Sequence, residues 1–139
     1  MEYLLYMWQM EDLIRAYGCS LTRIRREYID RFEYTDQQKD EEEDWFGDLI
    51  RMMNQEGKRE KGHLAINEVL LQDLGDLHVR LLQSTRFPFY SAEYYRVLPF
   101  IVELRQKGDK EIGEVETCLN ALYGVCLLYT SPSPRDISG

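Results

Sequence analysis

The residues most able to do chemistry are two histidines that lie near carboxylates in the sequence. Glu60 and His63 stand three residues apart, which is the spacing at which a bundle helix presents a carboxylate and an imidazole to one metal ion. Asp73 and Asp76 form a second acidic pair, and His78 follows them. Together these side chains are the candidate ligands of a small metal-dependent enzyme.

The spacing of these residues also gives two arguments against a metal site. A di-metal site of the bundle type needs two Glu-x-x-His motifs, and the sequence contains one, with Gly62 inside it. His63 and His78 are fifteen residues apart, which on one continuous helix is about 22 Å. Ordinary hydrogen-bonded histidines are therefore favoured over shared metal ligands, and we expect no cofactor.

No other motif indicates catalysis. Cys19 follows a glycine that should end a helix, and Cys118 lies on an apolar stripe, with no histidine close to either in the sequence. Glycine-rich phosphate loops and Rossmann patterns are missing. We predict no catalytic residues, and the sparse, odd set of cysteines predicts reduced thiols in a cytoplasmic protein.

Two charge clusters admit a structural and a functional interpretation. Residues 23–26 read RIRR, and residues 40–44 are five consecutive acids. Solvated helix faces are the favoured interpretation of both, while phosphate contact and docking to a basic partner are the alternatives. A further set of charged residues beside apolar stripes is expected to form ion pairs between helices: Glu11, Asp12, Arg15, Glu103 and Arg105.

Aromatic residues exceed what a small core usually needs. Tyrosine can bury its ring while its hydroxyl stays in water, which suits protein interfaces. Packing at the core boundary of a thin bundle explains the same surplus. The candidate interaction residues are Tyr3, Tyr6, Trp8, Tyr90, Tyr94 and Tyr95.

Composition places the chain among folded globular proteins. It has 139 residues, of which 44% are hydrophobic and 30% charged, which predicts one domain with a core. The formal net charge of −8 disfavours nucleic acid and anionic membranes as partners. No apolar run approaches the roughly 20 residues of a membrane span, and the first residues do not resemble a secretion signal. The expected partner is a protein or a second copy of the chain.

Apolar residues recur every three to four positions, which predicts an all-α fold. Ser20 is a candidate N-cap, Thr35 and Gln38 fit a capping box, and Gly18 is a candidate helix end. Short connections favour a small antiparallel bundle of five or six helices. The expected helices cover residues 2–17, 20–32, 35–56, 63–83, 91–108 and the segment from 114 onward.

The segment 63–83 is the predicted central helix. The apolar residues that run along it at helical spacing are Ile66, Val69, Leu70, Leu74, Leu77 and Leu81, and Leu71 and Leu82 widen this face. Gly75 inside it indicates a close crossing with another helix, because glycine otherwise costs about 1 kcal/mol there. In the segment 91–108, Pro99 should kink the helix or start a new one.

The C-terminal segment differs from the rest of the chain. CLLYTSPSPRD, residues 126–136, contains two prolines and shows no helical face beyond Tyr129. A disordered Ser/Pro-rich terminus is one interpretation. Back-translation, however, matches all eleven residues to the transposon end and adapter of short-read sequencing libraries. We therefore predict a non-native tail at 126–139, after a native helical domain at 1–125 that is truncated at both ends.

Several stretches of the chain resemble a known family. They are EYLLYMWQMEDLIRA, EKGHLAIN, DLHVRLL, FYSAEYYRVLPFIVELR and ETCLNALYG. Together they are similar to a Bacteroidetes family of small helical proteins described as a domain of unknown function. The resemblance covers nearly all of residues 2–124 and implies a helical fold and a bacterial source. It implies no catalytic residues.

Two functions follow from these patterns. The first is a cytoplasmic interaction or structural module, indicated by aromatic-rich faces without a catalytic constellation. The alternative is the small metal-dependent enzyme that would use the carboxylates and histidines at positions 60–78.

Overall fold

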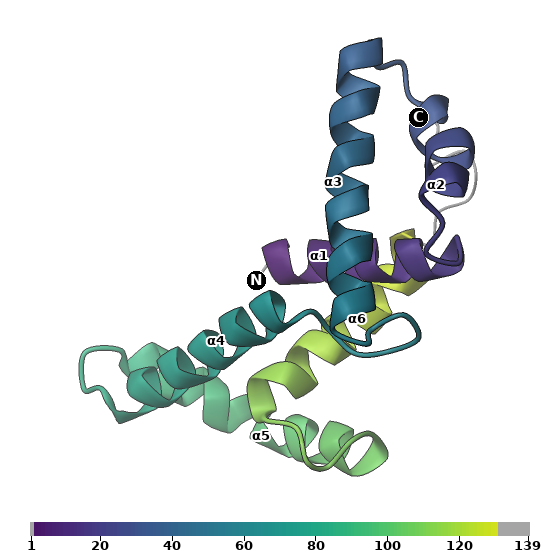
Figure 1. The fold of residues 1–139 in the computed structure, drawn as a ribbon. Helices are drawn as coiled ribbons and strands as arrows, with labels where there is room; N and C mark the ends of the chain where they lie inside the picture. The colour runs from purple at the N-terminus through teal and green to yellow at the C-terminus, as the bar shows by residue number, and fades with distance from the viewer. Residues whose placement is uncertain (1, 131–139) are drawn as a thin grey trace. The chain divides into compact units, whose positions relative to one another are not determined.

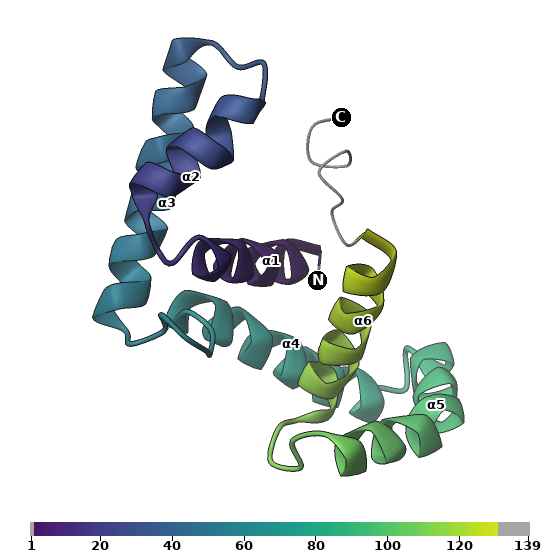
Figure 2. The same cartoon turned by 90° about the vertical axis from the view of Figure 1, so that its right-hand side faces the viewer.

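The computed structural model describes residues 2–130, with side chains through residue 128, and confirms the predicted all-α fold. No strand occurs in this described range. Figure 1 shows the succession of helices, and Figure 2 shows the same helices from the side. They are α1 (Glu2–Ala16), α2 (Leu21–Glu27), the short 3-10 helix η1 (Ile29–Arg31), α3 (Asp36–Gln55), α4 (Ala65–Gln83), α5 (Pro88–Lys107) and α6 (Glu114–Thr130).

The described chain divides into two compact units, and the boundary falls inside α4. The N-terminal unit comprises residues 2–68, and the C-terminal unit comprises residues 69–130. The predicted domain limits at 1–125 are not tested by this division and stay a prediction.

Local signals in the sequence set the helix ends of the N-terminal unit. The Ser20 hydroxyl accepts a hydrogen bond from the backbone N–H of Arg23, which caps α2. Thr35 and Gln38 form the predicted capping box at the start of α3. Gly18 has a φ of 66°, the left-handed conformation with which a glycine ends a helix. All three predictions are confirmed.

The core of the N-terminal unit lies where α1, α2 and α3 meet. Figures 1 and 2 show α2 running beside α3, to which it is joined through η1. Burying these apolar side chains is the main term that stabilises the unit. The buried cluster is Met7, Met10, Ile14, Ile24, Ile29, Phe46, Leu49, Ile50, Met53 and Leu64.

The two charge clusters meet each other inside this unit. Arg25, from the basic cluster, donates to Asp40 at 3.0 Å and to Glu43 at 2.9 Å, both in the acidic run. It also pairs with Asp30 at 3.3 Å. These contacts link α2 to α3, so at least one arginine of the basic cluster has a structural role.

Both prolines of α5 fit a continuous helix. Pro88 occupies the first turn, where the backbone N–H that proline lacks has no helical partner in any case. The helix therefore starts three residues before the predicted Ser91. It continues through Pro99 to Lys107, so of the two alternatives predicted for Pro99 the new helix is wrong and the kink stays a prediction.

Four of the six residues of the apolar stripe predicted along α4 are exposed, while Leu74 and Leu81 are partly buried. Ile66, Val69, Leu70 and Leu77 are 56%, 57%, 37% and 42% exposed. Leu71, on another side of the helix, is buried. Gly75 has no heavy atom within 4 Å of the position that a Cβ would occupy, so the expected close crossing is not there. Periodicity identified the helix correctly but could not say which of its two apolar sides is covered.

The last helix extends into the segment predicted to be foreign. α6 continues to Thr130, five residues into the predicted tail at 126–139. Residues 131–139 lie outside the described residues, so the origin of this tail stays a prediction. Between residues 2 and 130, no helix is long and apolar enough to cross a membrane.

Candidate functional site

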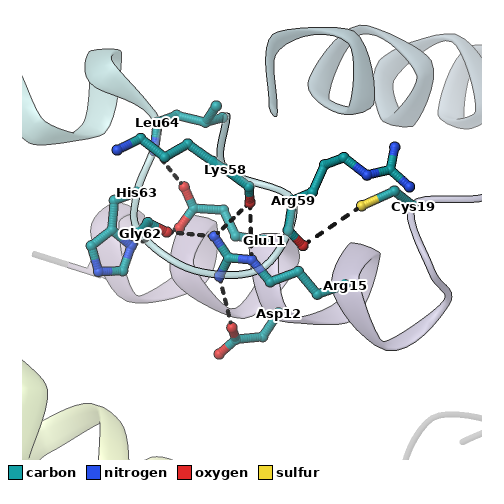
Figure 3. A network of polar contacts seen from close by, with 9 residues as sticks. All are labelled: Glu11, Asp12, Arg15, Cys19, Lys58, Arg59, Gly62, His63 and Leu64. Atoms are coloured by element: carbon teal, nitrogen blue, oxygen red, sulfur yellow. Dashed lines mark hydrogen bonds and ion pairs between the residues drawn. The ribbon is translucent and has the colours of Figure 1, made fainter. Parts of the chain in front are cut away.

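Each compact unit contains one histidine bound to a carboxylate. In the N-terminal unit, Glu11 on α1 is 1% exposed and lies against the loop before α4 (Figure 3). One carboxylate oxygen lies 2.8 Å from Nδ1 of His63, and the other accepts the backbone N–H of Leu64 at 2.8 Å. A buried carboxylate costs free energy unless it is hydrogen-bonded, and here both oxygens have partners.

Aromatic and cationic side chains complete this cluster. The His63 ring stacks on Trp8 with centroids 4.4 Å apart and an interplanar angle of 15°. Arg15, one turn along α1 from Glu11, donates to the backbone carbonyls of Lys58 and Gly62 (Figure 3). The cluster therefore clamps the loop 56–64 onto α1, and both Glu11 oxygens are already used. This arrangement has a structural role, because it holds the loop against the helix.

Ion pairs between helices were expected for the charged residues beside the apolar stripes. Arg15 instead pairs with Asp12 on the same helix at 3.1 Å and contacts backbone carbonyls. Glu103 pairs with Lys107, also on one helix. Glu11 was singled out correctly as a residue beside the core, but its partners come from a loop more than fifty residues away.

The second cluster joins three helices of the C-terminal unit. His78 on α4 places Nδ1 2.6 Å from the hydroxyl of Tyr90 and Nε2 3.1 Å from Glu114 at the start of α6. Tyr94, one turn after Tyr90 on α5, donates its hydroxyl to the other Glu114 oxygen at 2.7 Å. The result is a continuous chain of hydrogen bonds from Tyr90 through His78 and Glu114 to Tyr94, named the His78 cluster below.

The surroundings of the His78 cluster favour the un-ionised form of the Tyr90 and Tyr94 hydroxyls. The hydrogen bond to Glu114, together with partial burial, raises the pKa of Tyr94 to about 12. Partial burial, followed by the charges of Cys118 and Glu114, raises the pKa of Tyr90. Both hydroxyls are therefore un-ionised at neutral pH, and each can donate to the cluster.

Cys118 lies beside this cluster but is not an activated nucleophile. Although its side chain reaches solvent, desolvation of the thiol and the nearby Glu114 carboxylate raise the pKa of Cys118. Only the thiolate reacts readily, so a raised pKa makes the cysteine less reactive near neutral pH.

The candidate metal ligands do not gather in one place. His63 belongs to the N-terminal unit and His78 to the C-terminal unit, and each binds a carboxylate outside the predicted set. Glu60, Asp73 and Asp76 have exposed side chains. Among the described side chains, no group of three or more His, Cys, Asp or Glu residues could hold a metal ion. The metal-dependent enzyme therefore has no centre in this part of the chain.

The aromatic residues predicted for interaction separate into three groups. Tyr3, Tyr6 and Tyr95 are 55%, 49% and 65% exposed. Trp8 is buried against His63. Tyr90 and Tyr94 belong to the His78 cluster.

Sequence reasoning missed Glu114, which joins His78 to Tyr94. Its position in the first turn of a helix is common for glutamate and carries no signal of a partner 36 residues away.

Comparison with known proteins confirms the coarser part of the resemblance seen in the sequence, a domain of unknown function, and does not bear on the Bacteroidetes source. The family DUF4924, described as a domain of unknown function, matches residues 1–132. Neither the curated proteins nor the solved structures contain a match to the chain.

Proposed function

Because the chain belongs to the DUF4924 family, a domain of unknown function, its role must be inferred from its own residues, and we propose that it is a protein-interaction module. Its contact surface is the exposed apolar stripe of α4. This stripe consists of Ile66, Val69, Leu70 and Leu77.

The exposed stripe on α4 is the observation that supports this function. Val69 and Leu70 follow Ile66 by three and four residues, and Leu77 follows it by eleven, which is about three turns. The four side chains therefore share one side of the helix. Each is 37–57% exposed. Single exposed apolar residues are ordinary, whereas several exposed apolar residues on one side of a helix are typical of a surface that contacts another helix or groove.

The charges beside the stripe indicate the chemistry of a partner. Asp73 and Asp76 are exposed on α4, and Asp73 lies between Val69 and Leu77 along the stripe. A partner with an apolar face and basic residues at its rim would match this pattern. A second copy of the chain is the other candidate, and measuring the oligomeric state separates the two.

The test compares two substitutions on the same helix. Val69→Gln combined with Leu77→Gln makes the stripe polar. Val79→Gln is the matched control, because Val79 is 49% exposed but stands two residues, about 200°, around the helix from Leu77. We expect cross-linking and light scattering of the purified full chain to detect a dimer or a defined complex. The double variant should lose it, and the control should keep it.

Two outcomes of these experiments would exclude the interaction module. If the unchanged chain is monomeric and retains no protein from a bacterial lysate, the interaction module is excluded. It is also excluded if both variants associate as the unchanged chain does. Circular dichroism of both variants checks that they remain folded.

The location and source that we propose come from the sequence. Cys19 and Cys118 are free thiols, which supports a reducing compartment and hence the cytoplasm. The resemblance supports a source among the Bacteroidetes. Fractionation of cells that express the chain, with detection in the cytoplasmic or the membrane and periplasmic fractions, tests the location.

A further inference from the structure

A small pocket in the C-terminal unit has an unusual lining for such an acidic protein. It lies where the end of α5 meets the loop that follows, and its lining residues are Val102, Arg105, Gln106 and Lys110. Its volume is about 250 Å³. Pockets for drug-sized ligands usually measure roughly 300–1,000 Å³, so this one suits a small group.

Arg105 has hydrogen-bonding capacity that the protein does not use. Its Nη2 donates to the backbone carbonyl of Lys110 at 3.0 Å, which holds the loop against the helix. Its Nε is buried and has no hydrogen-bond partner. An unpaired buried donor is costly, and on a charged group the cost is larger. Arg105 lines the pocket, and a guanidinium has five N–H donors, so an acceptor there can use those that the Lys110 carbonyl does not take.

The two cations of the pocket are also unpaired. Within residues 2–128, no carboxylate forms an ion pair with Arg105 or Lys110. Their neighbour Lys107 binds Glu103 at 3.2 Å. Asp109, next to Lys110 in the sequence, accepts the backbone N–H of Glu111 at 2.9 Å. Arg105 and Lys110 therefore line the pocket without a bound carboxylate, although Asp109 and Glu111 flank Lys110 in the sequence.

The pocket lies within electrostatic reach of the His78 cluster. The positive charge of Arg105 acts on Tyr94, whose pKa it lowers against the larger raising effect of Glu114. Tyr94 in turn donates to Glu114, which binds His78. An anion bound beside Arg105 would therefore lie close enough to act on Tyr94. Tyr94 is connected to the His78 imidazole by the hydrogen bonds that both make with Glu114.

From this geometry we infer that the pocket binds a compact oxyanion, either a carboxylate or a phosphate group of a small molecule. Arg105 and Lys110 supply charge-assisted hydrogen bonds, which are about twice as strong as neutral ones. The Gln106 amide offers a further donor. Val102 forms an apolar wall for the part of the ligand next to the anionic group. This inference does not depend on the proposed interaction surface of α4.

Nuclear magnetic resonance titration of the full chain tests the site. Sodium phosphate and sodium acetate are added separately at constant ionic strength, with sodium chloride as the reference. We expect saturable shifts at Arg105, Gln106 and Lys110, with a dissociation constant on the order of 1 mM. A shift of the His78 imidazole signal should follow the same curve.

Matched variants separate the pocket from general charge effects. Arg105→Gln and Lys110→Gln should each weaken binding by about tenfold, since each removes a charge-assisted contact. Lys107→Gln removes one positive charge from the same end of α5 without touching the pocket, and should change the constant less than about twofold. Because Lys110 is exposed on a loop, Lys110→Gln keeps the test valid even if Arg105→Gln fails to fold.

Comparing the phosphate titration with the acetate titration identifies which class of anion the pocket binds. Saturation with phosphate alone identifies a phosphate site, and saturation with acetate alone identifies a carboxylate site. Saturation with both anions supports a site that binds carboxylate and phosphate groups alike. If neither anion saturates these signals, or if Lys107→Gln weakens binding as much as Arg105→Gln, the inference is overturned.

Discussion

At the scale of single residues, Glu11 shows how a carboxylate can be kept inside a helical protein. It is 1% exposed, and its two oxygens meet His63 and the backbone N–H of Leu64. The aromatic face of Trp8 covers the imidazole. Because the partners come from a loop, this residue ties the loop to α1 rather than joining two helices. Its role is to hold the fold in place.

Removing the Glu11 carboxylate should destabilise the N-terminal unit. Glu11→Ala leaves the buried N–H of Leu64 without an acceptor, so we expect a loss of about 1–3 kcal/mol in the free energy of unfolding. Urea denaturation followed by circular dichroism measures it. Glu60→Ala is the control, because Glu60 is exposed in the same loop and should change stability by less than about 0.5 kcal/mol. Equal effects of the two substitutions would contradict the clamp.

The His78 cluster predicts a dependence of stability on high pH. The folded protein raises the pKa of Tyr94 from 10.0 to about 12. Folding therefore favours the un-ionised phenol. The stabilisation is complete below the pKa of the unfolded chain and is lost as the pH rises through the folded pKa, that is, between about 10 and 12.

Unfolding experiments with two variants measure this effect. The stability of the unchanged chain should fall through this alkaline range more steeply than that of Tyr94→Phe, which has no phenol to ionise at this position. Tyr95→Phe removes an exposed tyrosine from the same helix and should behave like the unchanged chain. If Tyr94→Phe and the unchanged chain lose stability in parallel, the hydrogen bond to Glu114 does not contribute as described.

At the scale of elements, two glycines with different backbones give opposite predictions. Gly75 lies within α4 with open space around it, so Gly75→Ala should stabilise the chain by up to about 1 kcal/mol through helix propensity. Gly57 also has open space but has a φ of 69°. There, alanine must adopt a left-handed conformation, and Gly57→Ala should destabilise the chain by roughly 1 kcal/mol.

Thermal unfolding of the two glycine variants gives the comparison directly. The melting temperature should rise for Gly75→Ala and fall for Gly57→Ala. A fall for both would mean that α4 is in close contact with another surface at Gly75, which would revive the close crossing that the sequence suggested.

The helices themselves were largely predictable because their signals are local. Ser20 and Thr35 cap helices through contacts three residues away. The start of α5 shows where such reasoning fails: the sequence predicted it at residue 91, whereas Pro88 suits the first turn and the helix starts there.

At the scale of the whole molecule, the two units bury their apolar residues to different degrees. The N-terminal unit has a continuous buried cluster around Phe46 and Met53. In the described part of the C-terminal unit, the buried apolar residues are Leu71, Ile101 and Leu119. Phe89 and Phe100 on α5 are 86% and 63% exposed. Val69, Leu70 and Leu77 of the proposed contact surface belong to this C-terminal unit, in which much apolar area is exposed.

The sequence by itself determined the helical fold, most of the helix ends and the absence of a familiar catalytic motif, because these depend on residues a few positions apart. It also pointed to His78, Tyr90 and Tyr94, although only as separate candidates. Tertiary structure decided that they share Glu114, that Glu11 binds a loop, and that the stripe on α4 is uncovered. Each of those outcomes depends on chain segments distant in the sequence, and periodicity carries no information about which distant surfaces meet.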